Sequence, residues 1–438
     1  MPDPQIPTDA SGGVPTAEVS TGEAWRHAPL RNFLISQFLI MVAFFLQGAA
    51  LGKQVFDTSG REVDIAWIGL AEFVPAMALV LVTGWVADHV NRKLVALLAV
   101  GGEVVCALVL VWYVSSEPTR VWPYFVLAGL FGAFRAFSGP AMRAMPPMVA
   151  PPNGVPKAIT LSSVAWTSAS IFGPAISGML LAIRPAVAFG AAAVLFVLGA
   201  LWLTRVRLHP SFERTEPVQR PTLHTAVEGL RFIRRTPMLL AAISLDLFAV
   251  LFGGAVALLP AIAEDRLHVG NVAYGWLRAA PGIGAAAMGV VLASRPMRRR
   301  VGSTLLAAVA IFGGATVVLG LTRSYVVAFI ALLVLSAADM ISVVVRGTLV
   351  PLVTPDDKRG RVLAVEAVFI GASNELGAFE SGIAAQAFGV PTAVVGGGLA
   401  TIGVVGVWAA CFPVLRRLNR YEDLDRAAVS TTRGNTDA

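Results

Sequence analysis

The sequence predicts an all-α membrane protein with twelve transmembrane helices arranged as two six-helix pseudo-repeats. Of its 438 residues, 56% are hydrophobic and only 14% are charged, whereas a soluble chain carries about 25% charged residues. The apolar residues gather in runs of about 20, which is the length that crosses the hydrocarbon core of a bilayer. The two halves of the chain also repeat one another in pattern. Together these observations favour a polytopic helical bundle.

The chain divides into five parts. Residues 1–24 are rich in Pro, Gly, Ser and Thr and are expected to form a disordered cytoplasmic tail. They lack the basic start and apolar core of a secretory signal. The N-terminal six helices are expected within 25–204 and the C-terminal six within 237–412. A cytoplasmic linker at 205–236 separates these halves, and a cytoplasmic tail at 413–438 follows them.

The apolar runs give the expected spans in order. They are 32–54, 65–87, 94–114, 122–143, 158–182, 185–204, 237–260, 273–294, 303–321, 325–347, 362–386 and 391–412. Within the linker, Leu223 to Arg235 places apolar residues on one side and basic residues elsewhere, which predicts an amphipathic helix on the inner leaflet. The alternative for this stretch is a plain linker.

The distribution of positive charge sets the topology. With a cytoplasmic N-terminus, about 25 of the 34 Lys and Arg residues fall on the inner side. The excess of Lys and Arg over Asp and Glu therefore reflects membrane orientation and requires no nucleic-acid partner. We expect a multi-pass protein of the bacterial cytoplasmic (inner) membrane with both termini in the cytoplasm.

The composition argues against an enzyme. Cys106 and Cys411 both lie in apolar runs, and the few His residues have no metal-ligand spacing. The chain contains no H-E-x-x-H, no G-x-S-x-G at a helix start and no Walker loop. We therefore expect no metal and no cofactor, and a gradient or the substrate itself must supply the energy for transport.

A short charged stretch between the second and third expected spans reads G-x-x-x-D-x-x-x-R-K, from Gly84 through Asp88 to Arg92 and Lys93. The glycine permits close helix approach, the acid can accept hydrogen bonds, and the two bases hold the loop in the cytoplasm. The stretch resembles the loop motif of the major facilitator superfamily, although Asn91 stands where that family has glycine. The alternative is a charge cluster that only sets topology.

The two halves match at constant offsets. At an offset of 206 by subtraction, Glu72 matches Arg278, and at an offset of 204 Arg135 matches Asp339. Asp88 matches Ser294, so the second copy of the loop has lost its acid. Parallel repeats of this kind build transporters that hold substrate near the midplane, between the halves. Alternating access then follows from rocking one half against the other.

Charged residues inside the spans are the candidates for the transport pathway, because a charge at mid-bilayer costs about 2.5–3.5 kcal/mol. We hypothesise that Arg135 and Asp339 face the central cavity and pair with each other, or with substrate and proton in turn. The alternative is a structural ion pair for each with a neighbouring helix. Either Glu375 or Glu380 is a candidate proton carrier. The full candidate set is Arg135, Asp339, Glu72, Arg278, Glu375, Glu380, Asp246 and Glu103.

The fifth expected span contains small residues every four positions around Gly173, Pro174 and Gly178. Such spacing allows tight helix contact, and the proline bends the helix. The stretch resembles the antiporter motif of facilitator-superfamily exporters, with Ala169 and Ser177 in place of glycines. This resemblance favours export over uptake, while the alternative is ordinary small-residue packing.

Longer stretches resemble one branch of the superfamily. Residues 135–149 resemble the corresponding helix of drug/proton exporters that include macrolide efflux proteins. Residues 229–232, 259–263 and 274–286 resemble the enterobactin-exporter-like branch more closely. The resemblance implies export of a siderophore driven by the proton gradient, with multidrug or macrolide efflux as the alternative. The implied partners are a siderophore or drug-like small molecule, protons and the lipid bilayer, and we expect a monomer.

Overall fold

The computed structural model describes residues 19–208 and 223–423, and this part of the chain contains helices and no strand. The first half of the chain begins with α1 (Thr21–Arg26) and also contains the short α6 (Pro146–Val149). Its long helices are α2 (Ala28–Ser59), α3 (Glu62–His89), α4 (Arg92–Ser115), α5 (Trp122–Arg143), α7 (Val155–Leu181) and α8 (Pro185–Thr204).

The second half opens with α9 (Leu223–Arg235), followed by a helical segment that runs from Pro237 to Arg266. That segment consists of α10 (Pro237–Phe252), the 3-10 turn η2 (Gly254–Leu258), α11 (Leu259–Ala261) and the π-helical turn η3 (Ile262–Arg266). The remaining helices are α12 (Asn271–Ser294), α13 (Val301–Leu321), α14 (Tyr325–Val353), α15 (Asp356–Phe388), α16 (Val390–Cys411) and α17 (Pro413–Arg417).

The fold class predicted from the sequence is confirmed. Within the described residues, 11 helical segments are long and apolar enough to cross a membrane. The remaining long helix is α3, with 28 residues, in which several side chains lie outside the described residues. Each predicted span coincides with one of these helices, and α9 has the bounds that the amphipathic pattern predicts. Length and hydropathy therefore suffice to place the helices.

The expected tail 1–24 needs a correction at its end. Residues 1–18 lie outside the described residues, but Thr21–Arg26 form a helix closed by a capping box between Ser20 and Glu23. Two reciprocal hydrogen bonds, at 2.8 and 3.2 Å, join these residues, and the bonds from Ser20 hold the pKa of Glu23 below its usual value. The capping box supplies the order that composition alone did not predict. In the expected tail 413–438, α17 occupies the start, and residues 424–438 lie outside the described part.

Sharp turns join the spans. Gly60 ends α2 with φ of 63°, a left-handed conformation that glycine adopts without steric cost. At the start of α4, Asn91 Oδ1 accepts hydrogen bonds from the backbone N–H groups of Lys93 and Leu94 at 2.9 and 3.3 Å. Asparagine is a favoured N-cap residue. Its presence where the superfamily loop carries glycine therefore has a local structural reason.

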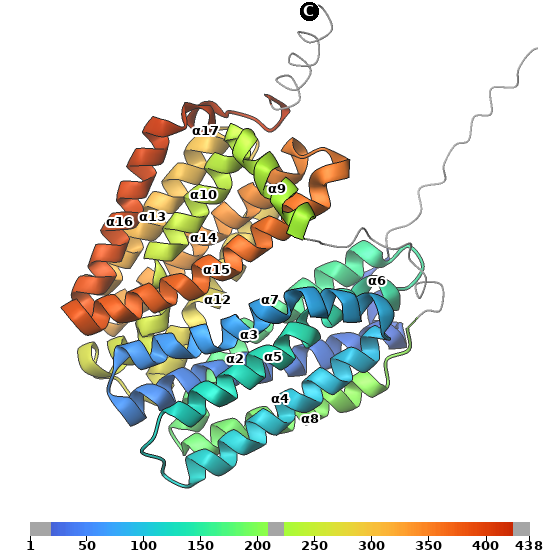
Figure 1. The fold of residues 1–438 in the computed structure, drawn as a ribbon, viewed down its shortest axis with the longest axis vertical. Helices are drawn as coiled ribbons and strands as arrows, with labels where there is room; N and C mark the ends of the chain where they lie inside the picture. Colours follow the sequence, from blue (N-terminus) through green and yellow to red (C-terminus); the bar gives the residue numbers. More distant parts are fainter. Residues whose placement is uncertain (1–18, 209–222, 424–438) are drawn as a thin grey trace, which may run out of the picture.

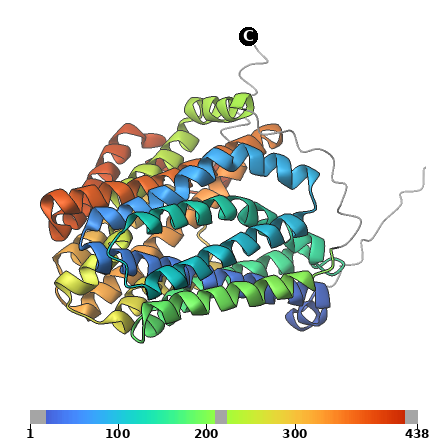
Figure 2. The same cartoon turned by 60° about the horizontal axis from the view of Figure 1, so that its bottom comes forward.

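The helices form two bundles that meet at one end (Figure 1). We define the far end by the loop around Gly60 and the segment 262–271, and the linker end by α6 and α9. In Figure 1 the bundles lie together at lower left and diverge towards α9 and α6. Figure 2 shows α9 standing on the outside of the helical body. The molecule is therefore joined at the far end and separated at the linker end.

The hydrophobic cores repeat this asymmetry. One core cluster runs through the first half and continues into far-end residues of the second half, including Leu259, Ile262 and Tyr274. A second cluster contains linker-end residues of the second half alone, including Ile233, Met238 and Leu415. Among the described residues, the apolar cluster that spans both halves reaches the second half through its far-end residues.

Polar contacts also cross between the halves at the far end. Tyr274 Oη donates a hydrogen bond to the Ala49 carbonyl at 2.9 Å, and Asn271 Nδ2 donates to the Leu181 carbonyl at 3.1 Å. The buried ammonium of Lys53 binds Glu264 of the second half at 2.6 Å and also pairs with Asp57. These contacts hold the far end closed.

Candidate functional site

The predicted charged residues separate into three groups and one outlier. The N-half group contains Arg135 and Glu103. The interface group, between the halves, contains Glu72, Arg278 and Glu375. The C-half group contains Asp246 and Asp339, together with Arg346 and Glu366, which are not among the candidates named from the sequence. Glu380, the outlier, is exposed on α15.

In the N-half group, Arg135 has aromatic and sulfur neighbours. Its guanidinium carbon lies 3.8 Å from the centre of the Phe44 ring, and Nη2 lies 3.7 Å from Met41 Sδ. Its Nη1 is buried and makes no hydrogen bond within the described part of the chain. A guanidinium over an aromatic face is stabilised by the ring quadrupole. The arginine thus keeps donor capacity available for another group.

Glu103 lies near this arginine and is completely buried. One of its carboxylate oxygens accepts a hydrogen bond from Ser138 Oγ at 2.6 Å. The other oxygen, Oε2, is buried and has no partner among the described residues. Arg135 also interacts electrostatically with Glu72, so the N-half group adjoins the interface group.

A row of aromatic rings leads away from Arg135. Phe44 lies 5.1 Å from Phe45, and Phe45 lies 5.4 Å from Trp166, measured between ring centres. The rings come from α2 and α7, while Arg135 comes from α5. Edge-to-face pairs of this kind add about 0.5–1.5 kcal/mol beyond their buried area. Because the Trp166 side chain is exposed, the row connects a half-buried cation to the surface of the bundle.

The interface group joins helices of both halves. Glu72 on α3 interacts electrostatically with Glu375 on α15 and with Arg278 on α12. Arg278 Nη1 donates a hydrogen bond to the Val256 carbonyl at 2.9 Å. The carboxylate of Glu375 lies against Gly69 on α3, where a Cβ atom would collide with it. The residues that the repeat matched as opposite charges, Glu72 and Arg278, thus meet where the halves touch.

The C-half group is centred on Arg346 of α14. Its Nη2 binds Asp246 of α10 at 2.9 Å, and its Nη1 binds Glu366 of α15 at 3.3 Å. Ser342 Oγ donates to Asp246 at 3.2 Å. The side chain of Arg346 is only 4% accessible, so the pairs replace water as the partners of this cation. A buried charge requires such partners.

Asp339 belongs to this group by electrostatic interaction with Asp246 and Arg346. It therefore does not pair with Arg135 in this conformation, and each of the two residues contacts its own half. Arg346 also lies inside an expected span, 325–347, but it is not among the candidate residues named from the sequence. The signal that could have identified it is its spacing from Asp339, because seven residues are close to two helical turns and place both on one face.

Only part of the loop motif is described. Lys93 Nζ donates to the carbonyls of Thr204 and Val206 at 2.7 and 2.8 Å, and thereby binds the end of α8. Arg92 Nη1 lies 3.6 Å from Met148 Sδ. The surroundings of Gly84 and Asp88 lie outside the described residues. The bases of the motif thus connect helix ends within the first half.

The small residues of α7 make close contacts on two sides. A Cβ atom at Gly173 would lie 2.6 Å from Cβ of Phe45 on α2, and one at Gly178 would lie 2.6 Å from the Cα atom of Gly275 on α12. The second contact crosses between the halves at the far end. Pro174 lies inside this helix and is buried. The motif therefore forms part of the far-end closure.

Comparison with known proteins identifies the family. Residues 23–432 match the profile of the transmembrane secretion effector family. The chain belongs to this family, within the major facilitator superfamily. Its members are transporters rather than enzymes, and the chain is a multi-pass membrane protein.

The relatives include three named transporters. YfiS of Bacillus subtilis, an MFS-type transporter, is 28% identical over 364 residues, covering 79% of this chain and 84% of YfiS. The multidrug efflux pump Tap of Mycolicibacterium fortuitum is 27% identical over 408 residues, covering 87% of this chain and 96% of Tap. The enterobactin exporter EntS of Escherichia coli is 26% identical over 350 residues, covering 77% of this chain and 80% of EntS.

Solved structures share the fold at low identity. The peptide transporter POT has a TM-score of 0.70 at 13% identity, covering 92% of this chain and 100% of that structure. A bacterial homologue of the lysosomal transporter Spinster, in an inward-facing and unoccupied conformation, has a TM-score of 0.66 at 16% identity. That match covers 89% of this chain and 97% of the homologue. Both similarities establish the major facilitator fold of this chain.

Proposed function

We propose that this transporter exports a siderophore from the cytoplasm by alternating access, in exchange for protons that enter. The observation that carries the proposal is the contrast between two arginines. Both keep one buried nitrogen without a partner among the described residues, but Arg135 lies beside an aromatic row and forms no ion pair in the described part of the chain, whereas Arg346 is held between two carboxylates. The first arrangement suits an anionic substrate, and the second suits a proton.

The proposal takes the linker end as cytoplasmic. Arginines concentrate there at the end of α9 and in the segment before α13, at Arg234, Arg235 and Arg298–Arg300. The positive-inside rule assigns such segments to the cytoplasm. With this orientation both termini lie in the cytoplasm, the membrane is the bacterial inner membrane, and the described state is closed to the outside.

The proposed moving halves are residues 25–204 and 237–412, and one chain supplies both, so a monomer suffices. The interface group formed by Glu72, Arg278 and Glu375 joins them through charge. Because these charges come from helices of both halves, their interactions must change when the halves rock. The residues assigned to gating and conformational change are those of the two motifs, namely Gly84, Asp88, Arg92, Lys93, Gly173, Pro174 and Gly178.

The substrate assignment rests on Arg135 and its aromatic row. A siderophore that carries aromatic rings and negative charge offers both chemistries that this row can bind. The enterobactin exporter among the relatives supports this class. Multidrug efflux is the second candidate, because the efflux pump Tap is matched over 96% of its length and aromatic rows bind many apolar molecules.

The proton site is assigned to the C-half group. One guanidinium faces Asp246, Glu366 and the nearby Asp339, so full ionisation would leave two uncompensated negative charges in a buried site. Intramembrane carboxylates with a charged partner commonly form proton relays. A proton taken up by Asp339 or Glu366 would weaken the electrostatic attraction between that carboxylate and Arg346. The weaker attraction would allow α14 and α15 to rearrange.

The proposal is tested in two steps. In a deletion strain, the siderophore content of cytoplasm and medium is measured, and susceptibility to a panel of drugs is measured in parallel. Siderophore that accumulates inside without drug sensitivity supports the proposal, whereas drug sensitivity with normal siderophore release favours efflux. Purified protein in proteoliposomes then shows whether an imposed proton gradient drives substrate movement. A rate of substrate movement that is the same with and without the proton gradient would contradict proton coupling.

A further inference from the structure

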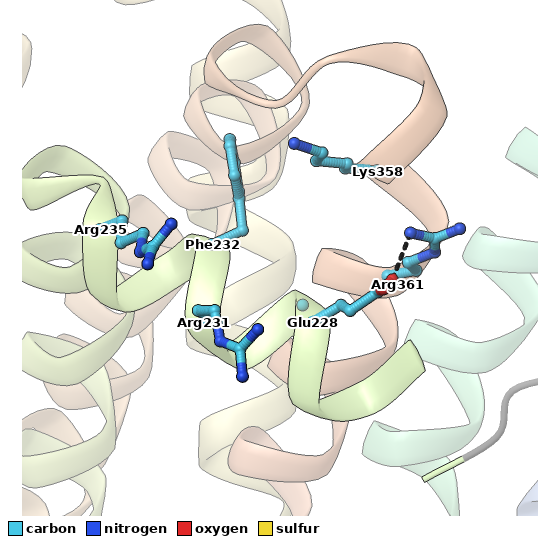
Figure 3. A pocket seen from close by; sticks show the side chains of 7 residues that line it. Glu228, Arg231, Phe232, Arg235, Lys358 and Arg361 are labelled. Carbon is cyan, nitrogen blue, oxygen red and sulfur yellow. Dashed lines mark hydrogen bonds and ion pairs between the residues drawn. The ribbon is translucent and has the colours of Figure 1, made fainter. Parts of the chain in front are cut away.

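A pocket outside the transport pathway lies between α9 and the start of α15. It has a volume of about 240 Å³. Figure 3 shows the side chains that line it, from Arg231 and its neighbours on α9 and from the facing turn of α15. The labelled residues are Glu228, Arg231, Phe232, Arg235, Lys358 and Arg361. Four of these side chains carry positive charge and one carries negative charge.

The pocket is built on a fixed junction between two helices. A Cβ atom at Gly229 would lie 2.9 Å from the Arg361 carbonyl oxygen, so the backbones of α9 and α15 approach closely. Glu228 binds Arg361 at 2.5 Å. Ile233 is buried in the core of the second half. Lys358 Nζ lies 5.1 Å from the centre of the Phe232 ring, which positions a cation over the pocket.

The charges of the pocket do not cancel. Glu228 neutralises Arg361, which leaves Arg231, Arg235 and Lys358 as the source of net positive charge. Within the described part of the chain, the side chains of Arg231 and Arg235 form no ion pair and no hydrogen bond. An anion in the pocket would therefore meet two arginines that have no carboxylate partner of their own among the described residues, beside the Glu228–Arg361 pair.

We propose that this pocket binds the phosphate headgroup of an anionic phospholipid of the inner leaflet. Arginine forks match phosphate oxygens in charge and geometry. Basic pockets between membrane helices on the cytoplasmic side bind anionic lipid headgroups. The pocket volume lies below the roughly 300–1,000 Å³ of sites for drug-sized ligands, and so favours a headgroup over a transported molecule.

The exposed surface of α9 supports a lipid over a soluble anion. Val227 is 51% exposed and precedes Arg231 by four residues, so an apolar side chain lies one turn from a basic one on the same face. That combination is typical of helices that lie at a membrane surface. A bound lipid would connect α9 to α15, which carries Glu366 and Glu375. The proposal rests on the cytoplasmic assignment of the linker end and does not depend on the transported substrate.

The test uses purified full-length protein in nanodiscs of phosphatidylethanolamine with increasing phosphatidylglycerol. Native mass spectrometry counts the phosphatidylglycerol molecules retained after delipidation. Arg231→Gln and Arg235→Gln are compared with Arg234→Gln, a neighbouring exposed arginine that does not line the pocket. Each pocket variant should weaken retention roughly fivefold, in line with the effect of one basic residue at an anionic surface. The control variant should retain lipid as the unmodified protein does.

Three results would overturn the proposal. An equal loss in Arg234→Gln would show that the total charge of α9, and not the pocket, attracts lipid. Displacement of the lipid by inorganic phosphate at millimolar concentration would identify a site for a soluble phosphate. Lys358→Gln provides a second pocket variant on α15, and a monodisperse elution profile confirms that each variant is folded. Retained lipid in all three pocket variants would also refute it.

Discussion

Arg135, which is half-buried, and Arg346, which is buried, lie on equivalent helices, α5 and α14 of the two halves, yet their surroundings differ. Arg346 is held by carboxylates from two other helices, whereas Arg135 lies over a ring and beside a sulfur atom. The duplication thus preserved the helices and changed the chemistry at their centres. In one half the central base is held in place by carboxylates, and in the other it keeps a donor that has no partner among the described residues.

The largest expected effect comes from removing the paired arginine. Arg346→Met leaves Asp246 and Glu366 buried without their cation, and breaking a buried pair costs about 3–5 kcal/mol. The melting temperature of the purified protein should therefore fall sharply, as measured by size-exclusion chromatography after heating. Adding Asp246→Asn and Glu366→Gln should restore much of the stability. Arg135→Met should cost much less, and an equal loss in both variants would break the comparison.

The next effect concerns substrate binding at the unpaired arginine. Arg135→Gln removes a charged donor worth about 1.5–3 kcal/mol to an anion, so KM for an anionic substrate should rise at least about tenfold. Transport of an uncharged substrate should change little. Arg184→Gln is the control, since Arg184 is an exposed arginine of the same half that does not act on Arg135. Unchanged KM in both variants would exclude Arg135 from substrate binding.

A smaller effect is expected for the acid that matches Arg135 in the repeat. Asp339→Asn removes one titratable group from the C-half group without removing a hydrogen-bonded partner of Arg346. Gradient-driven transport in proteoliposomes should slow roughly tenfold, about 1.4 kcal/mol in barrier height, and should respond less to external acidification. Downhill substrate exchange should persist. A variant with the normal response to pH would remove Asp339 from the proton pathway.

The smallest effects separate two acids on one helix. Glu375 is half-buried at the interface between the halves, whereas Glu380 is exposed. Glu375→Gln should alter the transport rate by a few-fold, because it changes the charge balance with Arg278. Glu380→Gln should change the rate within error. Comparable losses from both variants would show that exposure is a poor guide to function along α15.

Much of the fold could be predicted from the sequence, because the bilayer imposes a length on every span. The bounds of α9 also followed, since a period of 3.6 residues separates its apolar and basic sides. The partners of buried charges could not be predicted in this way. The offset that matches Arg135 with Asp339 records descent from one ancestral half, and it carries no information about which side chains touch.

The helical period also does not predict which charged side chains of α15 are buried. Glu366 and Glu380 lie about four helical turns apart and so share a face, but Glu366 is buried against Arg346 and Glu380 is exposed. The neighbours of a helix change along its length, so one face can be covered at one depth and open at another. The repeat selects positions where both halves carry a charge. At the offset of 204, Arg346 matches the uncharged Met142, so the repeat does not select it as a site residue.

The contact between Gly178 and Gly275 has a consequence for the transport cycle. At this point two helices touch main chain to main chain, with no interlocked rotamers to disengage. The contact itself contains no side chain, so parting the helices there requires only that the neighbouring Asn271–Leu181 hydrogen bond and the surrounding apolar contacts break. Adding even a single methyl group at this contact would force the two helices apart and so disfavour the orientation that is closed at the far end, before it affected the affinity for substrate.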